Sequence, residues 1–150
     1  MPYNKELLNL VNKLEMFQYF SDDEKQAFAE EISNAVVHYD VGEIIIHEGA
    51  DHGALYFLLQ GSVLITKSGY DYIVAQLSTG SIFGEMSFFT KKPRFSNVIA
   101  SDDVLAVKMD DDFFANVKPA IRDKIKNYLI EILIKRLDQM NAALVKISRQ

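Results

Sequence analysis

A chain of 150 residues with 49% hydrophobic residues and a formal net charge of −5 fits one domain, or one domain plus an appendage, with a sizeable core. The acidic balance argues against nucleic acid as the main partner, and the absence of cysteine excludes disulfides and cysteine-based zinc sites. No apolar run approaches the roughly 20 residues of a membrane span, and no signal peptide begins the chain, so we expect a cytoplasmic protein without a membrane span.

The first 34 residues predict helices. Apolar residues recur there at helical spacing, at Leu7, Leu8, Val11, Leu14 and Phe17. Farther on, Glu24 follows Ser21 at the spacing of a capping box, in which each side chain bonds the backbone N–H of the other residue. We therefore expect a second helix over about residues 22–33.

Residues 35–109 predict β-structure. Short runs rich in β-branched and aromatic residues alternate there with glycines, at intervals of about ten residues. The runs are Val36-Val37, Ile44–Ile46, Leu55–Leu59, Val63–Thr66, Tyr72–Leu77, Val98–Ala100 and Val104–Lys108. Many short strands with regular turn signals are typical of an all-β barrel or a jelly roll.

Residues 110–150 predict helices again, because no glycine lies between Pro119 and Arg149. Two apolar stripes run along this segment. The first stripe, which we expect to dock on the domain, consists of Ile121, Ile125, Leu129 and Ile132. The second stripe has heptad spacing and consists of Ile130, Leu133, Leu137, Met140, Leu144 and Ile147. Heptad spacing predicts a homodimer through paired helices. Alternatively, both stripes form one broad face that folds back on the β-domain.

The most informative segment covers residues 83–97. Gly84 and Glu85 begin a short apolar turn, and a basic loop follows that ends in Pro93 and Arg94. Backbone N–H groups at a helix start can cradle an anion, and an arginine fork fits two phosphate oxygens. A carboxylate accepts a hydrogen bond from a ribose hydroxyl. The segment therefore suits a ligand that carries both a phosphate and a sugar hydroxyl, although each residue alone also fits a surface ion pair or a solvated basic loop.

This segment resembles the phosphate-binding cassette of the cyclic nucleotide-binding domain family, as found in catabolite activator protein, protein kinase A regulatory subunits and cyclic nucleotide-gated channels. The matching residues are Phe83, Gly84, Glu85, Met86, Ser87, Phe88, Phe89, Pro93 and Arg94. Similar residues elsewhere extend the resemblance over roughly residues 15–118. It implies a mainly β fold with flanking helices: an eight-stranded jelly-roll barrel with N-terminal helices and a long C-terminal helix, in one domain overall.

The resemblance also implies a set of ligand-binding residues. They are Leu64, Ala75, Leu77, Gly84, Glu85, Met86, Ser87, Arg94, Phe95 and Ser96. In this set Arg94 would pair with the cyclic phosphate, and backbone N–H groups of Ser87, Phe95 and Ser96 would add donors. Glu85 would accept a hydrogen bond from the ribose 2′-hydroxyl. Leu64, Ala75 and Leu77, which precede the cassette in the sequence, would line the pocket for the base.

The remaining expectations concern the C-terminal helices and the identity of the ligand. Residues 110–150 would act as lid and dimer seam, with lid candidates Asn127, Tyr128 and Glu131. Phe95 stands where the family has a small or hydroxyl residue. A threonine there accompanies guanine preference in the family, so its absence favours cAMP over cGMP. The phenyl ring could also crowd the phosphate and leave no ligand.

The expected function is a regulatory sensor and not an enzyme, with no catalytic residue, metal or cofactor. Ligand binding would draw the cassette inward and reposition the C-terminal helix. One alternative is a ligand-free module for dimerisation or interaction. A more remote alternative is a cupin-like metal enzyme, which needs two histidines one residue apart. The histidines are His38, His47 and His52, and this spacing does not fit.

Overall fold

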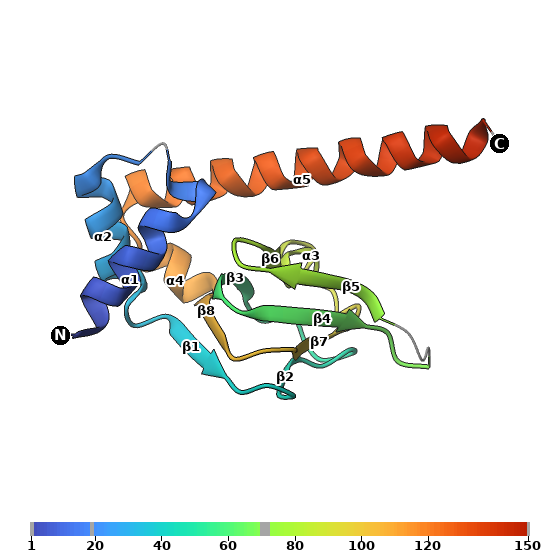
Figure 1. Ribbon diagram of the computed structural model, residues 1–150, viewed down its shortest axis with the longest axis horizontal. Helices are drawn as coiled ribbons and strands as arrows, with labels where there is room; N and C mark the ends of the chain where they lie inside the picture. Colours follow the sequence, from blue (N-terminus) through green and yellow to red (C-terminus); the bar gives the residue numbers. More distant parts are fainter. Residues whose placement is uncertain (1, 19, 70–72, 150) are drawn as a thin grey trace. The chain divides into compact units, whose positions relative to one another are not determined.

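The computed structural model describes residues 2–18, 20–69 and 73–149. The chain divides into two compact units, Met1–Asn116 and Val117–Gln150. The first unit holds the N-terminal helices, all the strands and the cassette, and the second holds one long helix (Figure 1).

The N-terminal segment folds into α1 (Pro2–Lys13), a 3-10 turn (Glu15–Phe17) and α2 (Asp22–Ile32), so the predicted helices are confirmed. The capping box is present: the Glu24 N–H donates to Ser21 Oγ at 3.1 Å, and the Ser21 N–H donates to Glu24 Oε1 at 3.0 Å. Such a cap contributes about 1 kcal/mol. The Phe17 ring packs 6.1 Å from the Phe57 ring, and this contact joins the helical segment to the β-structure.

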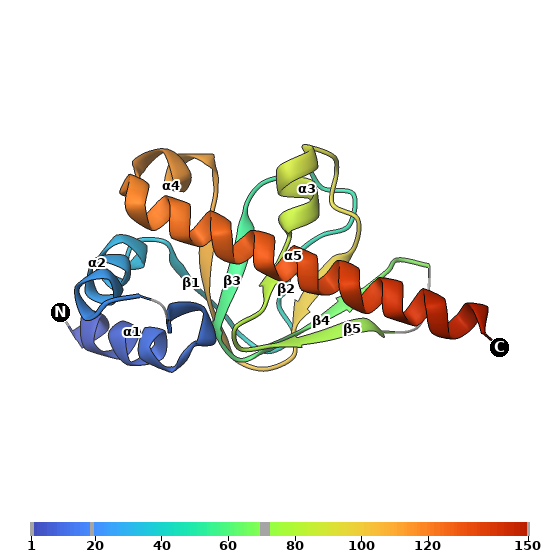
Figure 2. The ribbon, with the colours of Figure 1, turned by 90° about the horizontal axis from the view of Figure 1, so that it is seen from above.

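Eight strands follow in the described part of the chain. They are β1 (Val36–Tyr39), β2 (Ile44–Ile46), β3 (Leu55–Gln60), β4 (Ser62–Thr66), β5 (Ile73–Ser78), β6 (Ile82–Phe83), β7 (Asn97–Ala100) and β8 (Val104–Met109). One sheet has the order β1-β8-β3-β6, the other has the order β2-β7-β4-β5, and all pairs are antiparallel. Figure 2 shows these strands from a second side.

The expectation of eight strands in a jelly roll is confirmed, but the expectation of a closed barrel is not. No hydrogen-bonded pair of described strands joins the two sheets. The chain passes from one sheet to the other at Gly61, between β3 and β4. Two of the four edge strands, β2 and β6, have only 3 and 2 residues.

Strand β3 lies at the centre of the packing and is buried on both faces. Tyr56 and Leu58 belong to the core between the two sheets, while Phe57 on the opposite face meets the N-terminal helical segment through Phe17. The inter-sheet core consists of Ile46, Ala54, Tyr56, Leu58, Val63, Phe83, Val98, Ala100, Val104 and Ala106. This core carries the start of the cassette, because Phe83 belongs to it.

Helix α3 (Glu85–Thr90) lies between β6 and β7, and α4 (Asp111–Asn116) and α5 (Pro119–Ser148) follow β8. Helix α5 has 30 residues, which confirms the predicted long C-terminal helix, and a proline near its first turn suits a helix start. Within the described residues, no helix has the length and apolar character that crossing a membrane requires.

Candidate functional site: the cassette between β6 and β7

The cassette begins where β6 leaves the core. Phe83 at the end of β6 stacks on Tyr56, with ring centroids 5.1 Å apart. Gly84 then adopts a left-handed conformation (φ +78°), and Lys91 adopts another (φ +58°) after the single short helix α3. The Lys91 N–H closes this helix by donating to Ser87 O at 2.9 Å. The helix is thus held between two sharp turns of the backbone.

Arg94 lies at the centre of the cassette. Its Nη1 donates to Gly84 O at 2.8 Å and to Ser87 Oγ at 2.6 Å, and its Nη2 donates to Ala54 O at 2.6 Å. The arginine is only 7% exposed, so it is not the surface residue that the simpler interpretation of the sequence requires. Burial lowers the pKa of the Arg94 guanidinium from its usual value, and the nearby Glu85 acts in the opposite direction. A guanidinium nevertheless stays protonated in proteins.

The Arg94 guanidinium retains capacity for a further partner. Its three hydrogen bonds within the described residues use three of the five N–H donors that a guanidinium has. All three acceptors are neutral oxygens. A buried cation is costly unless charge nearby compensates it. An anion would supply such charge, together with Glu85, which is also buried at 7% exposure.

The backbone of the exit loop is fixed to the loop between β2 and β3. The Arg94 N–H donates to Ala50 O at 2.8 Å, and Arg94 O accepts from the Gly49 N–H at 2.8 Å. The second loop also supplies the Ala54 carbonyl that holds the guanidinium. Two segments far apart in the sequence therefore hold Arg94 from both its backbone and its side chain.

The structure brings together most of the cassette residues that the sequence singled out. Glu85 and Ser87 are buried beside Arg94, and Ser96 is partly buried. The side chain of Met86 is 62% exposed and that of Phe95 is 77% exposed. Any contact of these last two residues with a ligand in the cassette therefore falls to their backbones.

The register of β4 and β5 separates the three expected base-contacting residues. Val63 pairs with Leu77 and Ile65 with Ala75, whereas Leu64 pairs with Gln76. Val63 is fully buried in the core, so Ala75 and Leu77 share its inward face, and Leu64 lies on the opposite face. Ile65 lies where Leu64 was expected. Alternation along a strand places Leu64 and Ile65 on opposite faces, but only the pairing with β5 shows which face Ala75 and Leu77 share.

A polar cluster beside the cassette was not anticipated from the sequence. Lys67 Nζ lies 2.8 Å from Glu48 Oε1 and donates to the carbonyl oxygen of Phe95 at 2.6 Å. The Ser68 N–H donates to Glu48 Oε2 at 2.6 Å, and the Glu48 N–H donates to Asn97 Oδ1 at 2.9 Å. No sequence signal links these residues, because they come from three separate segments.

The Glu48 carboxyl should titrate far below its usual range. Its hydrogen bond from Lys67, followed by those from Ser68, lowers the pKa of Glu48 from 4.5 to about 2. Because the folded-state pKa is depressed, the stabilisation from this group is complete above about pH 4.5 and is lost as the pH falls through about 2. NMR titration of the Glu48 side chain should give this low midpoint, and Lys67→Met should move it back towards 4.5. A midpoint near 4.5 in the unaltered chain would contradict the ion pair.

A metal centre of the cupin type finds little support in the geometry. His47 and His52 are both exposed. Among the described residues, one group of three metal-binding types lies close together, His38, Asp40 and Asp103, and all three are exposed. This group includes His38 but neither His47 nor His52, and exposed acidic groups of this kind are common without a metal.

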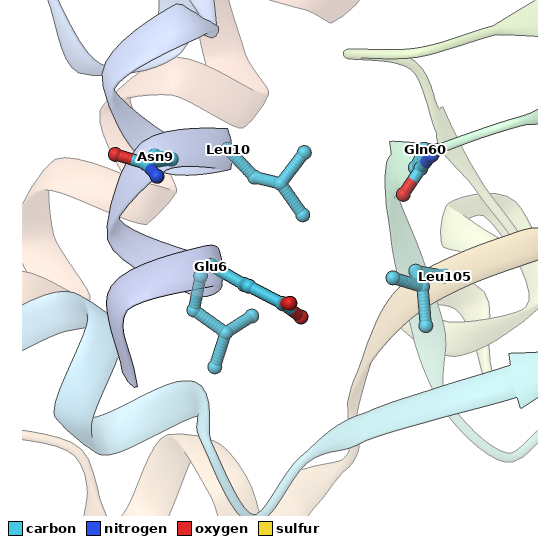
Figure 3. A pocket seen from close by; sticks show the side chains of 6 residues that line it. Glu6, Asn9, Leu10, Gln60 and Leu105 are labelled. Atoms are coloured by element: carbon cyan, nitrogen blue, oxygen red, sulfur yellow. The ribbon is translucent and has the colours of Figure 1, made fainter. Parts of the chain in front are cut away.

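A cavity of about 380 Å³ lies away from the cassette, between α1 and the ends of β3 and β8 (Figure 3). Figure 3 shows Glu6 and Leu10 of α1 pointing towards Gln60 and Leu105. The Glu6 carboxylate at its edge opposes the entry of an anion. A phosphate-bearing ligand is therefore better matched to the cassette.

Comparison with known proteins gives a consistent result. The profile of the cyclic nucleotide-binding domain family matches residues 36–118. The chain is 29% identical over 145 residues to the cAMP-dependent protein kinase type II regulatory subunit of Drosophila melanogaster, covering 95% of this chain and 35% of that protein. It is 30% identical over 108 residues to the CRP-like cAMP-activated global transcriptional regulator of Mycobacterium tuberculosis, covering 70% of this chain and 48% of that protein.

The solved structures show the same fold. A cyclic nucleotide-binding domain from Methylobacillus flagellatus aligns with a TM-score of 0.71 at 24% identity, covering 92% of this chain and 80% of that structure. The chain spans about a third to a half of the length of the two curated relatives above. From the matched residues and the shared fold, we conclude that the chain belongs to the cyclic nucleotide-binding domain family.

Proposed function

We propose that this domain binds cAMP in the cassette and acts as a regulatory sensor. The observation that carries the proposal is the buried Arg94, whose bonds to three neutral acceptors leave both donors and positive charge for an anion. Both curated relatives described above carry cAMP in their names. A cyclic phosphate has a single negative charge, which matches one guanidinium.

The ligand would use the cassette from end to end. Arg94 and the backbone N–H groups of Ser87, Phe95 and Ser96 would bind the phosphate. Glu85 would accept a hydrogen bond from the ribose 2′-hydroxyl beside Gly84. On the base side, the register favours Ile65 together with Ala75 and Leu77. The Phe95 ring is 77% exposed, which supports a phosphate site free of crowding by that ring.

The proposed preference for cAMP over cGMP rests on Phe95. Phe95 has no side-chain hydroxyl, so no hydroxyl there could accept a hydrogen bond from the guanine amino group or donate one to the guanine carbonyl group. A purine would then be held mainly by the apolar side chains of β4 and β5, which do not distinguish the two bases by hydrogen bonds. We expect tighter binding of cAMP because removing the polar groups of adenine from water costs less free energy than removing those of guanine.

A route for signal transfer leads from α3 to α4 within the first unit. The Phe88 and Phe114 rings lie 5.7 Å apart, and Lys91 Nζ lies 3.4 Å from Asp111 Oδ1. A cassette that moves on binding would therefore displace α4, which directly precedes α5. A ligand shifts such an equilibrium only by its difference in affinity for the two arrangements. The lid role of Asn127, Tyr128 and Glu131 stays a prediction.

Calorimetric titration of the purified chain with cAMP and with cGMP tests the proposal, with 5′-AMP as the control. The open phosphate of 5′-AMP carries more charge and cannot adopt the cyclic geometry. We expect saturable binding of one cAMP per chain, weaker binding of cGMP and none of 5′-AMP at the same concentrations. Absence of heat with both cyclic nucleotides would refute the proposal and favour the ligand-free interaction module.

The second apolar stripe supports a homodimer through α5. Five of its six residues are exposed, from 54% at Ile130 to 64% at Ile147, and Leu133 is partly buried. An exposed apolar row at heptad spacing on one helix is the pattern that a second, identical helix would cover. The proposed seam consists of Ile130, Leu133, Leu137, Met140, Leu144 and Ile147.

Leu137→Glu should convert this dimer to a monomer, because the new carboxylates would face each other in an apolar seam. Sedimentation velocity should report twice 17.1 kDa for the unaltered chain and 17.1 kDa for the variant. Ala142→Glu, five residues farther along and off the heptad seam, adds the same charge and should leave the dimer intact. A variant Leu137→Glu that still sediments as a dimer would refute the seam.

A further inference from the structure

We propose that Lys67 is a positioning residue for the phosphate site: it fixes the peptide between Phe95 and Ser96 so that the Ser96 N–H is aimed at the ligand. This inference rests on the proposed function, and it adds a residue that lies outside the cassette sequence. Lys67 follows β4 and is separated from Phe95 by 28 positions.

The ammonium group of Lys67 makes three contacts. Its Nζ donates to the carbonyl oxygen of Phe95 at 2.6 Å and lies 3.8 Å from the centroid of the Phe95 ring. The same Nζ lies 2.8 Å from Glu48 Oε1. The cation–π contact holds the ring on the outside of the cassette, where it is 77% exposed. The residue that departs from the family pattern is thus held by its carbonyl and its ring together.

The planarity of the peptide bond transmits this restraint. In a trans peptide, the C=O of one residue and the N–H of the next point in opposite directions. A carbonyl of Phe95 that is fixed towards Lys67 therefore turns the N–H of Ser96 away from Lys67. Within the described residues, no hydrogen bond of this N–H is found, so the donor is available.

The positive charge also strengthens the donor. A hydrogen bond to the carbonyl of a peptide polarises the whole amide group, and the effect is larger when the donor is an ammonium. The Ser96 N–H then carries more positive charge than an ordinary amide. Lys67 would act on the phosphate through this peptide without touching the phosphate itself.

Glu48, the ion-pair partner of Lys67, is held in place by a closed network of hydrogen bonds. Glu48 accepts from the Ser68 N–H at 2.6 Å, and its own N–H donates to Asn97 Oδ1 at 2.9 Å. Asn97 Nδ2 in turn donates to Ser68 Oγ at 3.2 Å. This network joins the β2–β3 loop, the residue pair that follows β4 and the start of β7. The side chains of Lys67 and Glu48 are 29% and 20% exposed, so solvent screens their ion pair only in part.

The test is the variant Lys67→Met, which keeps the apolar stem and removes the ammonium. Lys108→Met, at an exposed position of β8, removes the same charge outside the cassette and serves as the control. Calorimetry with cAMP should show about tenfold weaker binding for Lys67→Met, the loss typical of one hydrogen bond with a strengthened donor. The thermal midpoint should fall for Lys67→Met, because the change also removes the ion pair with Glu48, and it should stay unchanged for Lys108→Met.

A second measurement separates positioning from a merely structural role. The Sp and Rp phosphorothioates of cAMP place sulfur at one or the other exocyclic oxygen, so their affinity ratio reports on the donors around each oxygen. Lys67→Met should change this ratio, and Lys108→Met should not. An unchanged ratio would overturn the positioning role, whether or not the thermal midpoint falls. Unchanged cAMP affinity in Lys67→Met would overturn it as well.

The inference can fail independently of the proposed function. In the ligand-free chain, the Ser96 amide resonance in a proton–nitrogen correlation spectrum should shift in Lys67→Met and stay in place in Lys108→Met. If the unaltered chain binds no cyclic nucleotide, the proposed function is refuted. If the Ser96 resonance does not shift, the inference about Lys67 is refuted, whatever the chain binds.

Discussion

Replacing Arg94 by lysine is expected to weaken cAMP binding by at least about thirtyfold. Lysine keeps the charge, but one ammonium cannot bond Gly84 O and Ala54 O together and also meet a phosphate with a planar fork. Loss of a buried, hydrogen-bonded charge pair costs roughly 2–5 kcal/mol, and each 1.4 kcal/mol corresponds to about a factor of ten. Calorimetric titration with cAMP measures the change directly.

Arg94→Ala should abolish binding too, but with a cost to the fold. The sequence alone suggests that this variant loses little stability. In the structure, however, the change removes the donor from the buried Ala54 carbonyl, from the partly buried Gly84 carbonyl and from the Ser87 hydroxyl. Each unsatisfied buried group costs about 1–3 kcal/mol, so a lower thermal midpoint is expected. Arg149→Ala, at an exposed position, is the matched control and should change neither quantity. Binding of cAMP by Arg94→Lys at the original affinity would contradict the assigned phosphate site.

Gly84→Ala is expected to have the second large effect, on stability and on binding together. Gly84 has φ +78°, a conformation that costs alanine about 1–2 kcal/mol. An added Cβ would also lie 2.9 Å from Arg94 Nη1, 3.0 Å from Ile46 Cδ1 and 3.1 Å from Ala54 O. Crowding of this kind costs about 1–3 kcal/mol more. Chemical denaturation should therefore show a total loss of about 2–5 kcal/mol.

Gly42→Ala separates the two causes. Gly42 has φ +90°, but nothing lies within 4 Å of its added Cβ, so only the backbone strain should appear there. Binding of cAMP should survive in Gly42→Ala and be lost in Gly84→Ala, because only the second change displaces Arg94. Equal stability losses in the two variants would show that the close approach at Gly84 is unimportant. Normal cAMP affinity in a folded Gly84→Ala would exclude Gly84 from the site.

The local features of this fold could be predicted from the sequence because each depends on residues close together in the chain. The capping box of Ser21 and Glu24 needs a spacing of only three residues, and the cassette residues lie within one short segment. The long C-terminal helix is predicted by apolar residues that recur every three or four positions. One strand escaped this approach: β6 has only 2 residues, which is too short for any periodic pattern.

Features that depend on pairing between distant segments could not be obtained in this way. The face of β4 that Leu64 occupies depends on the register with β5, and a shift of one residue exchanges the faces. The separation into two sheets depends on which strands pair at the edges. The restraint on Phe95 requires Lys67 and Glu48 to meet from two different loops.

The amino-acid sequence by itself thus determined the kind of protein: the family, the helices at both ends, the strand-rich middle and the segment that bears the candidate phosphate site. Only the tertiary structure decided that Arg94 is buried among carbonyls, that the Phe95 ring lies outside the cassette and that Lys67 holds it there. The physical reason is that residue types and their local spacing are written along the chain. Burial and long-range hydrogen bonds arise only when the strands have paired and the loops have met.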